Sequence, residues 1–262
     1  MADSRIVAVT GAARGIGEAI ARELSSRGFS LLLGDLDSSV VSLASSLGGV
    51  GGVLDVTDQA SYETWLALVP RVDVLVNNAG VMWVGPFEDE PLEVAEKQLA
   101  VNFFGVVRGT LLVLPAMRAR RSGLVVTVAS LASYVTPAGE STYAASKHAV
   151  LGWMKGVRQE LRGSGVSLAL IMPAVVDTEL AAGTSSGGGP RLSPAAVARA
   201  VADVIDKPRF ETIVPAYAGL LPRVLAVLPQ WGRDLVYRRL VPNQVRDADL
   251  AARADYEARH LG

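Results

Sequence analysis

The sequence predicts a single α/β domain of the doubly wound (Rossmann-type) class, in which helices cover both faces of a parallel sheet of about seven strands. Two observations lead to this prediction. Short apolar runs alternate with amphipathic or alanine-rich segments from the first residues to about Pro215. Several of these runs, such as Leu31-Leu32-Leu33, are apolar throughout, as expected for strands that are covered on both faces. Alternation of this kind implies right-handed crossover connections.

The predicted elements follow one another without a break. We expect strands at 5–10, 30–35, 50–55, 72–77, 123–129, 166–172 and 210–214. We expect helices at 15–27, 38–47, 59–68, 91–119, 142–162 and 194–206. No repeat, linker or charge run divides residues 1–215, so we expect one domain, with residues 216–262 as a C-terminal extension that packs on it.

The composition narrows the chemistry that this chain can perform. Of its 262 residues, 50% are hydrophobic and 19% are charged, which favours a sizeable core over disorder. A formal net charge of −1 provides no basic field for nucleic acid. Because cysteine is absent and histidine occurs only at His148 and His260, we expect no disulfide, thiolate chemistry or metal site. Catalysis must come from Ser, Tyr, Lys, Asn and acidic side chains, or from a cofactor.

We expect a cytoplasmic location, because the apolar segments indicate neither a signal peptide nor a membrane span. The first predicted strand, Arg5 to Thr10, begins close to the initiator methionine and leaves no room for a signal peptide. The longest uncharged stretch, 122–139, is interrupted by Ser, Thr, Tyr, Pro and Gly. It therefore indicates a buried strand and a loop, not a membrane span.

A glycine-rich turn, Thr10 to Gly17, connects the first strand to the first helix. Glycines at such a turn, here Gly11, Gly15 and Gly17, let backbone amides approach a pyrophosphate, while the helix N-terminus supplies partial positive charge. The spacing is G-x-x-x-G-x-G, not the commoner G-x-G-x-x-G. An ordinary tight turn is the competing interpretation.

Asp35 ends the second predicted strand, where a carboxylate can accept a hydrogen bond from an adenosine ribose hydroxyl. The same carboxylate would repel a 2′-phosphate, so Asp35 favours NAD(H) over NADP(H). Arg14 points the other way, since a guanidinium in the turn can pair with that phosphate. Its alternative role is that of a solvated turn residue, and NADP(H) is not excluded.

Tyr143 and Lys147 lie four residues apart in an alanine-rich stretch that is predicted to be helical, so they share one face. A phenol with a pKa of about 10 is a poor base at neutral pH. A nearby cation stabilises the phenolate, and lowering the pKa by about three units takes roughly 4 kcal/mol. A tyrosine tuned in this way can exchange a proton with an alcohol or a carbonyl. A chance Tyr-x-x-x-Lys pair on a surface helix is the competing interpretation.

Ser130 follows a predicted strand, at the sheet edge where doubly wound folds carry their chemistry. We therefore expect Ser130 and Tyr143 to converge on one substrate oxygen, with Ser133 as a weaker candidate. The alternative is a serine that merely begins a loop.

Taken in order, these motifs closely resemble those of the short-chain dehydrogenase/reductase family over residues 5 to about 215. The matching motifs are Thr10 to Gly17, Asp55-Val56, Asn77-Asn78-Ala79-Gly80, Asn102, Ser130, Tyr143 to Lys147, and Pro173 to Thr178. The family usually has Pro-Gly after the sixth strand, where this chain has Pro173-Ala174, a change that can reshape the pocket beside the nicotinamide.

The resemblance implies a role for each matched residue. Tyr143 is the acid/base, Ser130 polarises the substrate oxygen, and Lys147 lowers the tyrosine pKa and holds the nicotinamide ribose. Asn102 binds a water that relays protons from Lys147 to solvent. The implied cofactor-binding residues are Gly11, Arg14, Gly15, Ile16, Gly17, Asp35, Asp55, Val56, Asn78, Ala79, Gly80, Tyr143, Lys147, Pro173, Val176 and Thr178. The resemblance also implies a homodimer or homotetramer, formed through the helices at 91–119 and 142–162.

The C-terminal extension suggests a lipophilic substrate. Residues 219–241 combine Leu, Val and Trp231 with four arginines and one acid, so this segment is either a lid or subunit contact, or a segment that lies on a membrane surface. The loop 182–193 is flexible by composition and typical of a lid. For Met82, Trp83, Val135 and Trp153 the alternatives are cleft lining and core packing. The charged tail 246–262 is expected to be helical and solvated.

The sequence therefore predicts a nicotinamide-dependent oxidoreductase that interconverts a lipophilic alcohol and its carbonyl. The alternative is a non-catalytic dinucleotide-binding sensor on the same fold. The intact set of Ser130, Tyr143 and Lys147 favours the enzyme.

Overall fold

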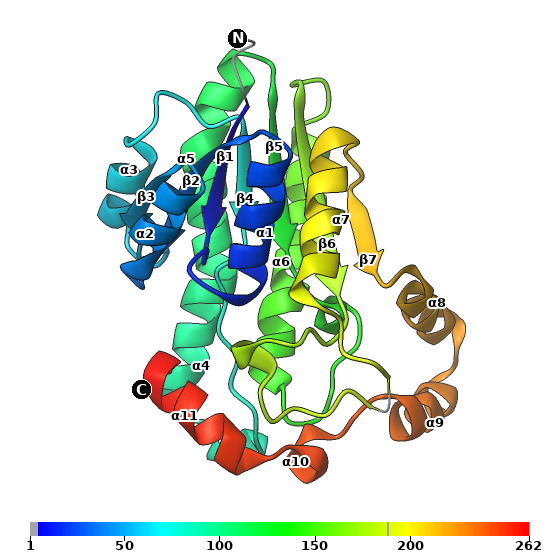
Figure 1. The fold of residues 1–262 in the computed structure, drawn as a ribbon. Coiled ribbons are helices and arrows are strands. Elements are labelled where there is room, and N and C mark those ends of the chain that lie inside the picture. Colours follow the sequence, from blue (N-terminus) through cyan, green and yellow to red (C-terminus); the bar gives the residue numbers. More distant parts are fainter. Residues whose placement is uncertain (1–4, 188, 262) are drawn as a thin grey trace.

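A seven-stranded parallel sheet forms the centre of the molecule (Figure 1). The computed structural model describes residues 5–187 and 189–261. The strand order is β3-β2-β1-β4-β5-β6-β7, and every neighbouring pair is parallel. The strands are β1 (Ile6–Thr10), β2 (Ser30–Asp35), β3 (Val50–Val53), β4 (Val74–Asn77), β5 (Gly123–Val128), β6 (Val166–Pro173) and β7 (Glu211–Val214). All seven predicted strands are confirmed.

Helices cover both faces of this sheet because successive strand residues point to opposite sides. In β1, Val7 and Val9 join the core formed with α1 (Gly15–Ser26), α2 (Ser39–Ser46) and α7 (Pro194–Asp206). Ala8 joins the opposite core, formed with α3 (Gln59–Leu66), α5 (Gly105–Ala119) and α6 (Ser141–Glu160). The predicted doubly wound architecture is therefore confirmed.

The long helix predicted at 91–119 is interrupted. It consists of α4 (Leu92–Leu99), a π-helical turn (Ala100–Phe104) and α5. By length and composition, Leu92–Ala119 is the one stretch among the described residues that is able to cross a membrane, with a mean hydropathy of 1.7. Within the domain 44% of that window is buried, since α5 packs against the sheet.

The C-terminal extension runs beneath the carboxyl ends of the strands, from β7 at one side of the sheet to α4 at the other (Figure 1). After a short 3₁₀ turn (Ala216–Gly219) it forms four helices. These are α8 (Leu220–Val227), α9 (Gln230–Leu240), α10 (Gln244–Asp247) and α11 (Leu250–His260).

The charged tail is helical, as expected, but it is not solvated on every side, because one face of α11 is packed into the molecule. Arg253 is only 1% exposed and Tyr256 only 4%. The Arg253 guanidinium donates hydrogen bonds to the carbonyl oxygens of Leu180 at 2.6 Å, Ala182 at 3.3 Å and Met82 at 2.5 Å. It also pairs with Glu257 at 3.1 Å. One buried cation thus joins α11 to the loops that follow β4 and β6.

Arg253→Met should lower the free energy of unfolding by about 3 kcal/mol, because three carbonyl groups and Glu257 lose a buried donor while the apolar stem is kept. Thermal and urea unfolding would measure this loss. Arg246→Met is the control, since Arg246 is exposed on α10 and should leave Tm unchanged. Equal Tm values for the two variants would contradict the structural role of Arg253.

Candidate active site

A cavity of about 1220 Å³ opens at the carboxyl ends of the strands. Most of the residues predicted for the site line it: Gly11, Arg14, Gly15, Ile16, Asp35, Asp55, Val56, Asn78, Ala79, Gly80, Ser130, Tyr143, Lys147, Pro173, Val176 and Thr178. Gly17 and Asn102 lie behind this lining. The cavity therefore brings together the glycine turn, the predicted acid/base residue and the loop after β6.

The glycine turn fits a phosphate group. Gly11 and Gly15 have φ values of 65° and 57°, which favour glycine. A Cβ on Gly17 would stand 1.9 Å from the Gly11 carbonyl oxygen, so the turn is too tight for a side chain there. At the start of α1, Arg14 is in the N-cap position and its side chain makes no capping hydrogen bond. The first amides of α1 are therefore free of a side-chain cap, and this arrangement suits an anion.

Thr10 and Asn78 join the glycine turn to the loop after β4. The Thr10 hydroxyl oxygen accepts hydrogen bonds from the backbone N–H groups of Asn78 at 3.0 Å and Ala79 at 3.1 Å. In return, the Asn78 side-chain amide donates to the carbonyl oxygens of Thr10 at 3.1 Å and Gly11 at 2.9 Å. These bonds hold the turn in position beside β4.

Asp35 stands at the end of β2 on the rim of the cavity. Its carboxylate accepts hydrogen bonds from the backbone N–H groups of Ala13 at 2.9 Å and Asp37 at 3.0 Å. Arg14 is paired with Glu179 at 3.2 Å and Asp37 at 3.6 Å. The turn arginine thus has two carboxylate partners, in addition to the solvent that reaches its partly exposed side chain.

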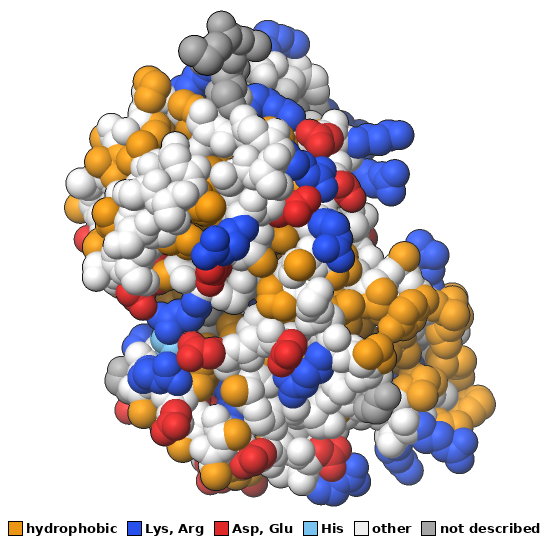
Figure 2. Space-filling model, viewed as in Figure 1, with side chains coloured by type: hydrophobic (Ala, Val, Ile, Leu, Met, Phe, Trp, Pro, Cys, Tyr) orange, Lys and Arg blue, Asp and Glu red, His pale blue; other side chains and the backbone are white. Residues whose placement is uncertain are grey.

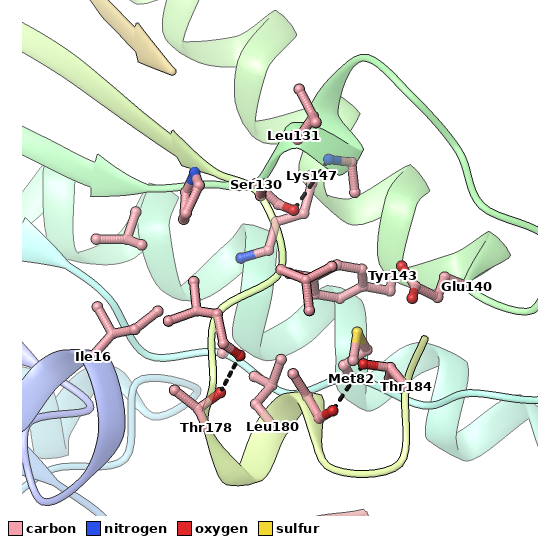
Figure 3. A pocket seen from close by; sticks show the side chains of 18 of the residues that line it. Ile16, Met82, Ser130, Leu131, Glu140, Tyr143, Lys147, Thr178, Leu180 and Thr184 are labelled. Atoms are coloured by element: carbon pink, nitrogen blue, oxygen red, sulfur yellow. Dashed lines mark hydrogen bonds between the residues drawn. The ribbon is translucent and has the colours of Figure 1, made fainter. Parts of the chain in front are cut away.

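Ser130, Tyr143 and Lys147 are grouped on one wall of the cavity, with Thr178 and Leu180 across from them (Figure 3). Tyr143 and Lys147 lie on the buried face of α6, and the Lys147 Nζ atom is 5.4 Å from the centroid of the Tyr143 ring. Ser130 follows β5 with an extended backbone, and its Oγ accepts a hydrogen bond from Ala132 N–H at 3.1 Å. The chance-pair interpretation does not account for this convergence.

Asn102 lies in the π-helical turn and is fully buried. Its Oδ1 accepts from the Val81 N–H at 2.8 Å, and its Nδ2 donates to the Val81 carbonyl oxygen at 2.8 Å and to Ser146 Oγ at 3.1 Å. A Cβ on Gly80 would lie 3.3 Å from Asn102 Oδ1 and 3.6 Å from Lys147 Nζ. Asn102 and Lys147 therefore both lie close to Gly80, and both hydrogens of the Asn102 amide are used by protein groups.

Burial is the main cause of the shifted pKa values of Tyr143 and Lys147. It raises the pKa of the Tyr143 phenol well above its usual range, with smaller increases from Glu140 and Tyr256, while the hydrogen bond with Ser130 acts in the opposite direction. Burial also lowers the pKa of Lys147 to about 8. The lowering of the tyrosine pKa by Lys147 stays a prediction, because burial of the phenol acts in the opposite direction.

Glu140 lines the cavity beside Tyr143 and was not among the predicted site residues (Figure 3). It is 7% exposed, and burial raises its pKa to about 7, although Arg253 and a hydrogen bond with Gln244 act in the opposite direction. The single sequence signal was an acidic residue three positions before Tyr143, and only the tertiary structure reveals that it is buried.

The end of α11 also reaches the cavity, through Tyr256, Arg259 and His260. Arg259 pairs with Glu179 at 3.1 Å, so this acid bridges Arg259 and Arg14. In the sequence, Arg253, Tyr256 and His260 are spaced so that they share one face of a helix, and this spacing is the signal that could have found them.

Two of the five weaker sequence candidates line the cavity, and three do not. Met82 and Val135 line the cavity, whereas Trp83 and Trp153 are not among its lining residues. Ser133 is fully buried and also lies outside the lining, so its predicted role near the substrate is not supported.

Comparison with known proteins identifies the family. The family model for short chain dehydrogenases matches residues 5–187. Oxidoreductase UcpA of Salmonella typhimurium is 38% identical over 183 residues, which cover 66% of this chain and 70% of that protein. This chain therefore belongs to the short-chain dehydrogenase/reductase family and is an oxidoreductase, as its motifs predicted.

Two solved structures show the same fold. A short-chain dehydrogenase/reductase from Burkholderia phymatum in complex with NAD gives a TM-score of 0.77 at 25% identity, covering 92% of this chain and 97% of its own. A short-chain dehydrogenase from Burkholderia cenocepacia in complex with NADP gives a TM-score of 0.79 at 25% identity, covering 91% and 98%.

Glu140→Gln should make the protein less sensitive to rising pH. A carboxyl group whose pKa is raised by folding contributes stability that is complete below its unfolded pKa and is lost as the pH rises through the folded value. For Glu140 this window ends near pH 7, and a rise from 4.5 to about 7 corresponds to about 3 kcal/mol.

The measurement is Tm at pH 5 and pH 8. The Tm of Glu140→Gln relative to wild type should be higher at pH 8 than at pH 5. The control, Glu160→Gln, changes an exposed carboxylate at the other end of α6 and should keep the wild-type difference between the two pH values. A Glu140→Gln protein with the wild-type pH dependence would contradict the burial of this charge.

Proposed function

We propose that this protein is an NAD-preferring oxidoreductase that interconverts a lipophilic alcohol and its carbonyl compound. The observation that carries the proposal is the convergence of Ser130, Tyr143 and Lys147 on a cavity that also contains the glycine turn and Asp35. The related Burkholderia structures, with NAD in one and NADP in the other, support a nicotinamide dinucleotide as the cofactor.

The chain's residues fit such a cofactor. The amides at the start of α1 would hold the pyrophosphate, and Asp35 would accept a hydrogen bond from the adenosine ribose. Asp55 and Val56 line the groove on the adenine side, while Pro173, Val176 and Thr178 line the opposite end beside Lys147. Bound there, the nicotinamide would exchange a hydride with the substrate carbon.

Tyr143 would move the proton. Because its pKa is raised, it is a neutral phenol at neutral pH and can donate its proton to a carbonyl oxygen during reduction. Alcohol oxidation requires the phenolate, so its rate should rise with pH. Ser130 would hydrogen-bond the same substrate oxygen. Lys147 remains largely protonated at pH 7 and would hold the ribose and return protons to Tyr143.

Asn102 would support Lys147 through its backbone. Both polar atoms of its side chain are bonded to Val81 and Ser146, and both amide hydrogens are used, so the side chain has no donor left for a relay water. The backbone carbonyl in the π-helical turn is the remaining candidate, since π-helical turns often occur at functional sites.

A lipophilic substrate fits the rest of the cavity. Away from the catalytic wall its lining includes Leu180, Pro190, Leu221 and Val236. We also propose a homodimer or homotetramer formed through α4–α5 and α6. The exposed side chains Leu92, Phe104 and Leu111 on the first of these segments support a subunit contact there.

Tyr143→Phe should retain NADH binding but lower kcat by roughly 10³, because the proton donor is lost while the ring still fills its place. Fluorescence titration with NADH and steady-state turnover of a secondary alcohol would measure the two effects. Tyr134→Phe removes a phenol that is hydrogen-bonded to Glu211 at 2.7 Å and serves as the control, with wild-type kcat. Full activity in Tyr143→Phe would refute the proposed acid/base, whereas a wild-type protein that binds NADH but turns over no alcohol would favour the non-catalytic sensor.

Asp35→Asn should raise the affinity for NADPH about tenfold, because the repulsion of a 2′-phosphate is relieved while an acceptor for the Ala13 N–H is kept. Titrations of wild type and variant with NADH and NADPH provide the measurement. Wild-type protein that bound NADPH more tightly than NADH would overturn this interpretation of the carboxylate.

A further inference from the structure

Seven exposed apolar side chains gather on α8, α9 and the 3₁₀ turn before them. They are Tyr217, Leu220, Val224, Val227, Trp231, Leu235 and Leu240, and are called the apolar face below. Figure 2 shows hydrophobic side chains concentrated on the part of the molecule where these helices stand. Trp231 is 73% exposed and Val227 is 81% exposed, values that are costly for large apolar groups in water.

The two helices bury little of their own surface. Leu225 is the single buried residue of α8, and Gly232 is the single buried residue of α9. On α8 the exposed residues Leu220, Val224 and Val227 form a stripe at helical spacing. Such short helices gain their stability mainly from packing of an apolar stripe, and here that stripe is uncovered.

The mouth of the active-site cavity lies within the apolar face. Tyr217, Leu220, Val224 and Leu240 are exposed and also line the cavity. A lipophilic molecule that is bound against this face can therefore reach the catalytic wall without crossing bulk water.

Positive charge accompanies the apolar face. Arg223, Arg233, Arg238 and Arg239 are exposed on the same two helices. Asp234 is the one acid in α8–α9, and it accepts a hydrogen bond from Gln230 at 2.8 Å. Among the ion pairs between described residues, none involves these four arginines. Figure 2 shows Lys and Arg side chains along the lower edge of the hydrophobic area.

We propose that the apolar face docks on an anionic lipid surface and that the enzyme takes its lipophilic substrate from the membrane through the mouth between α8 and α9. Apolar side chains next to unpaired arginines match the acyl boundary and the anionic headgroups of a bilayer. A second protein chain on the same face would close the mouth of the cavity. A bilayer there would instead deliver lipophilic substrate to the mouth. The substrate part of this inference rests on the proposed function, but the docking part does not.

The test uses the full-length protein and sedimentation with vesicles of phosphatidylcholine alone or with 30% phosphatidylglycerol, on the order of the anionic content that attracts basic segments. Wild type should bind the anionic vesicles, and Val227→Asp with Trp231→Asp should lower the partition coefficient at least about tenfold. Changing the four arginines to glutamine should remove the preference for phosphatidylglycerol. Phe87→Asp with Leu68→Asp is the matched control, because these side chains are 76% and 46% exposed elsewhere, and it should bind like wild type.

Turnover separates docking from chemistry. Val227 and Trp231 do not line the cavity, so the double variant should oxidise a short-chain secondary alcohol in water at the wild-type rate. It should oxidise a long-chain secondary alcohol embedded in anionic vesicles at least about tenfold more slowly. If wild type binds vesicles but oxidises neither alcohol, the proposed function fails while the docking stands.

Three outcomes would overturn the inference. The first is wild-type protein that stays in the supernatant with both vesicle compositions. The second is an equal loss of binding in the control variant. The third is a wild-type oligomer without vesicle binding that Val227→Asp with Trp231→Asp dissociates on gel filtration, because a second copy would then cover the face.

Discussion

The reciprocal hydrogen bonds between Thr10 and Asn78 fix the distance between the two halves of the candidate active site. Thr10 ends β1 at the glycine turn, and Asn78 begins the loop after β4, which continues through Gly80 to Val81. Val81 is bonded to Asn102, and Gly80 packs against both Asn102 and Lys147. A short series of hydrogen bonds between side chains and backbone therefore connects the glycine turn to the neighbourhood of Lys147 on α6, and a shift of either half would be transmitted to the other.

Much of this arrangement could be predicted from the sequence. The apolar runs of the strands located the sheet, and the parallel topology then required Ser130 and the glycine turn to meet at one edge. The helical spacing of Tyr143 and Lys147 predicted their common face. These predictions succeeded because each depends on local periodicity or on a rule of parallel sheets.

The remaining features depend on tertiary contacts that no local pattern contains. The charged tail 246–262 seemed suited to solvent, yet Arg253 is buried because loop carbonyls and Glu257 satisfy its guanidinium. Burial raises the pKa of Tyr143, and the spacing of Tyr143 and Lys147 in the sequence gives no sign of that burial. Glu140 likewise belongs to the candidate site because α10 and α11 enclose it, with Gln244 and Arg253 acting on its carboxyl group. Desolvation depends on which segments pack together in the folded molecule, and no local sequence pattern contains that information.

The π-helical turn at Ala100–Phe104 fixes how many residues must lie between α4 and α5. A π-helical turn holds one more residue than an α-helical turn, and one residue rotates a helix by about 100°. The face of α5 that meets the sheet, with Gly109, Val113 and Met117, is therefore set by this additional residue. Loss of one residue between 100 and 104 would turn that whole face away from the core, whereas replacement of the half-exposed Phe104 would not. The segment thus constrains the number of residues more strictly than their identity.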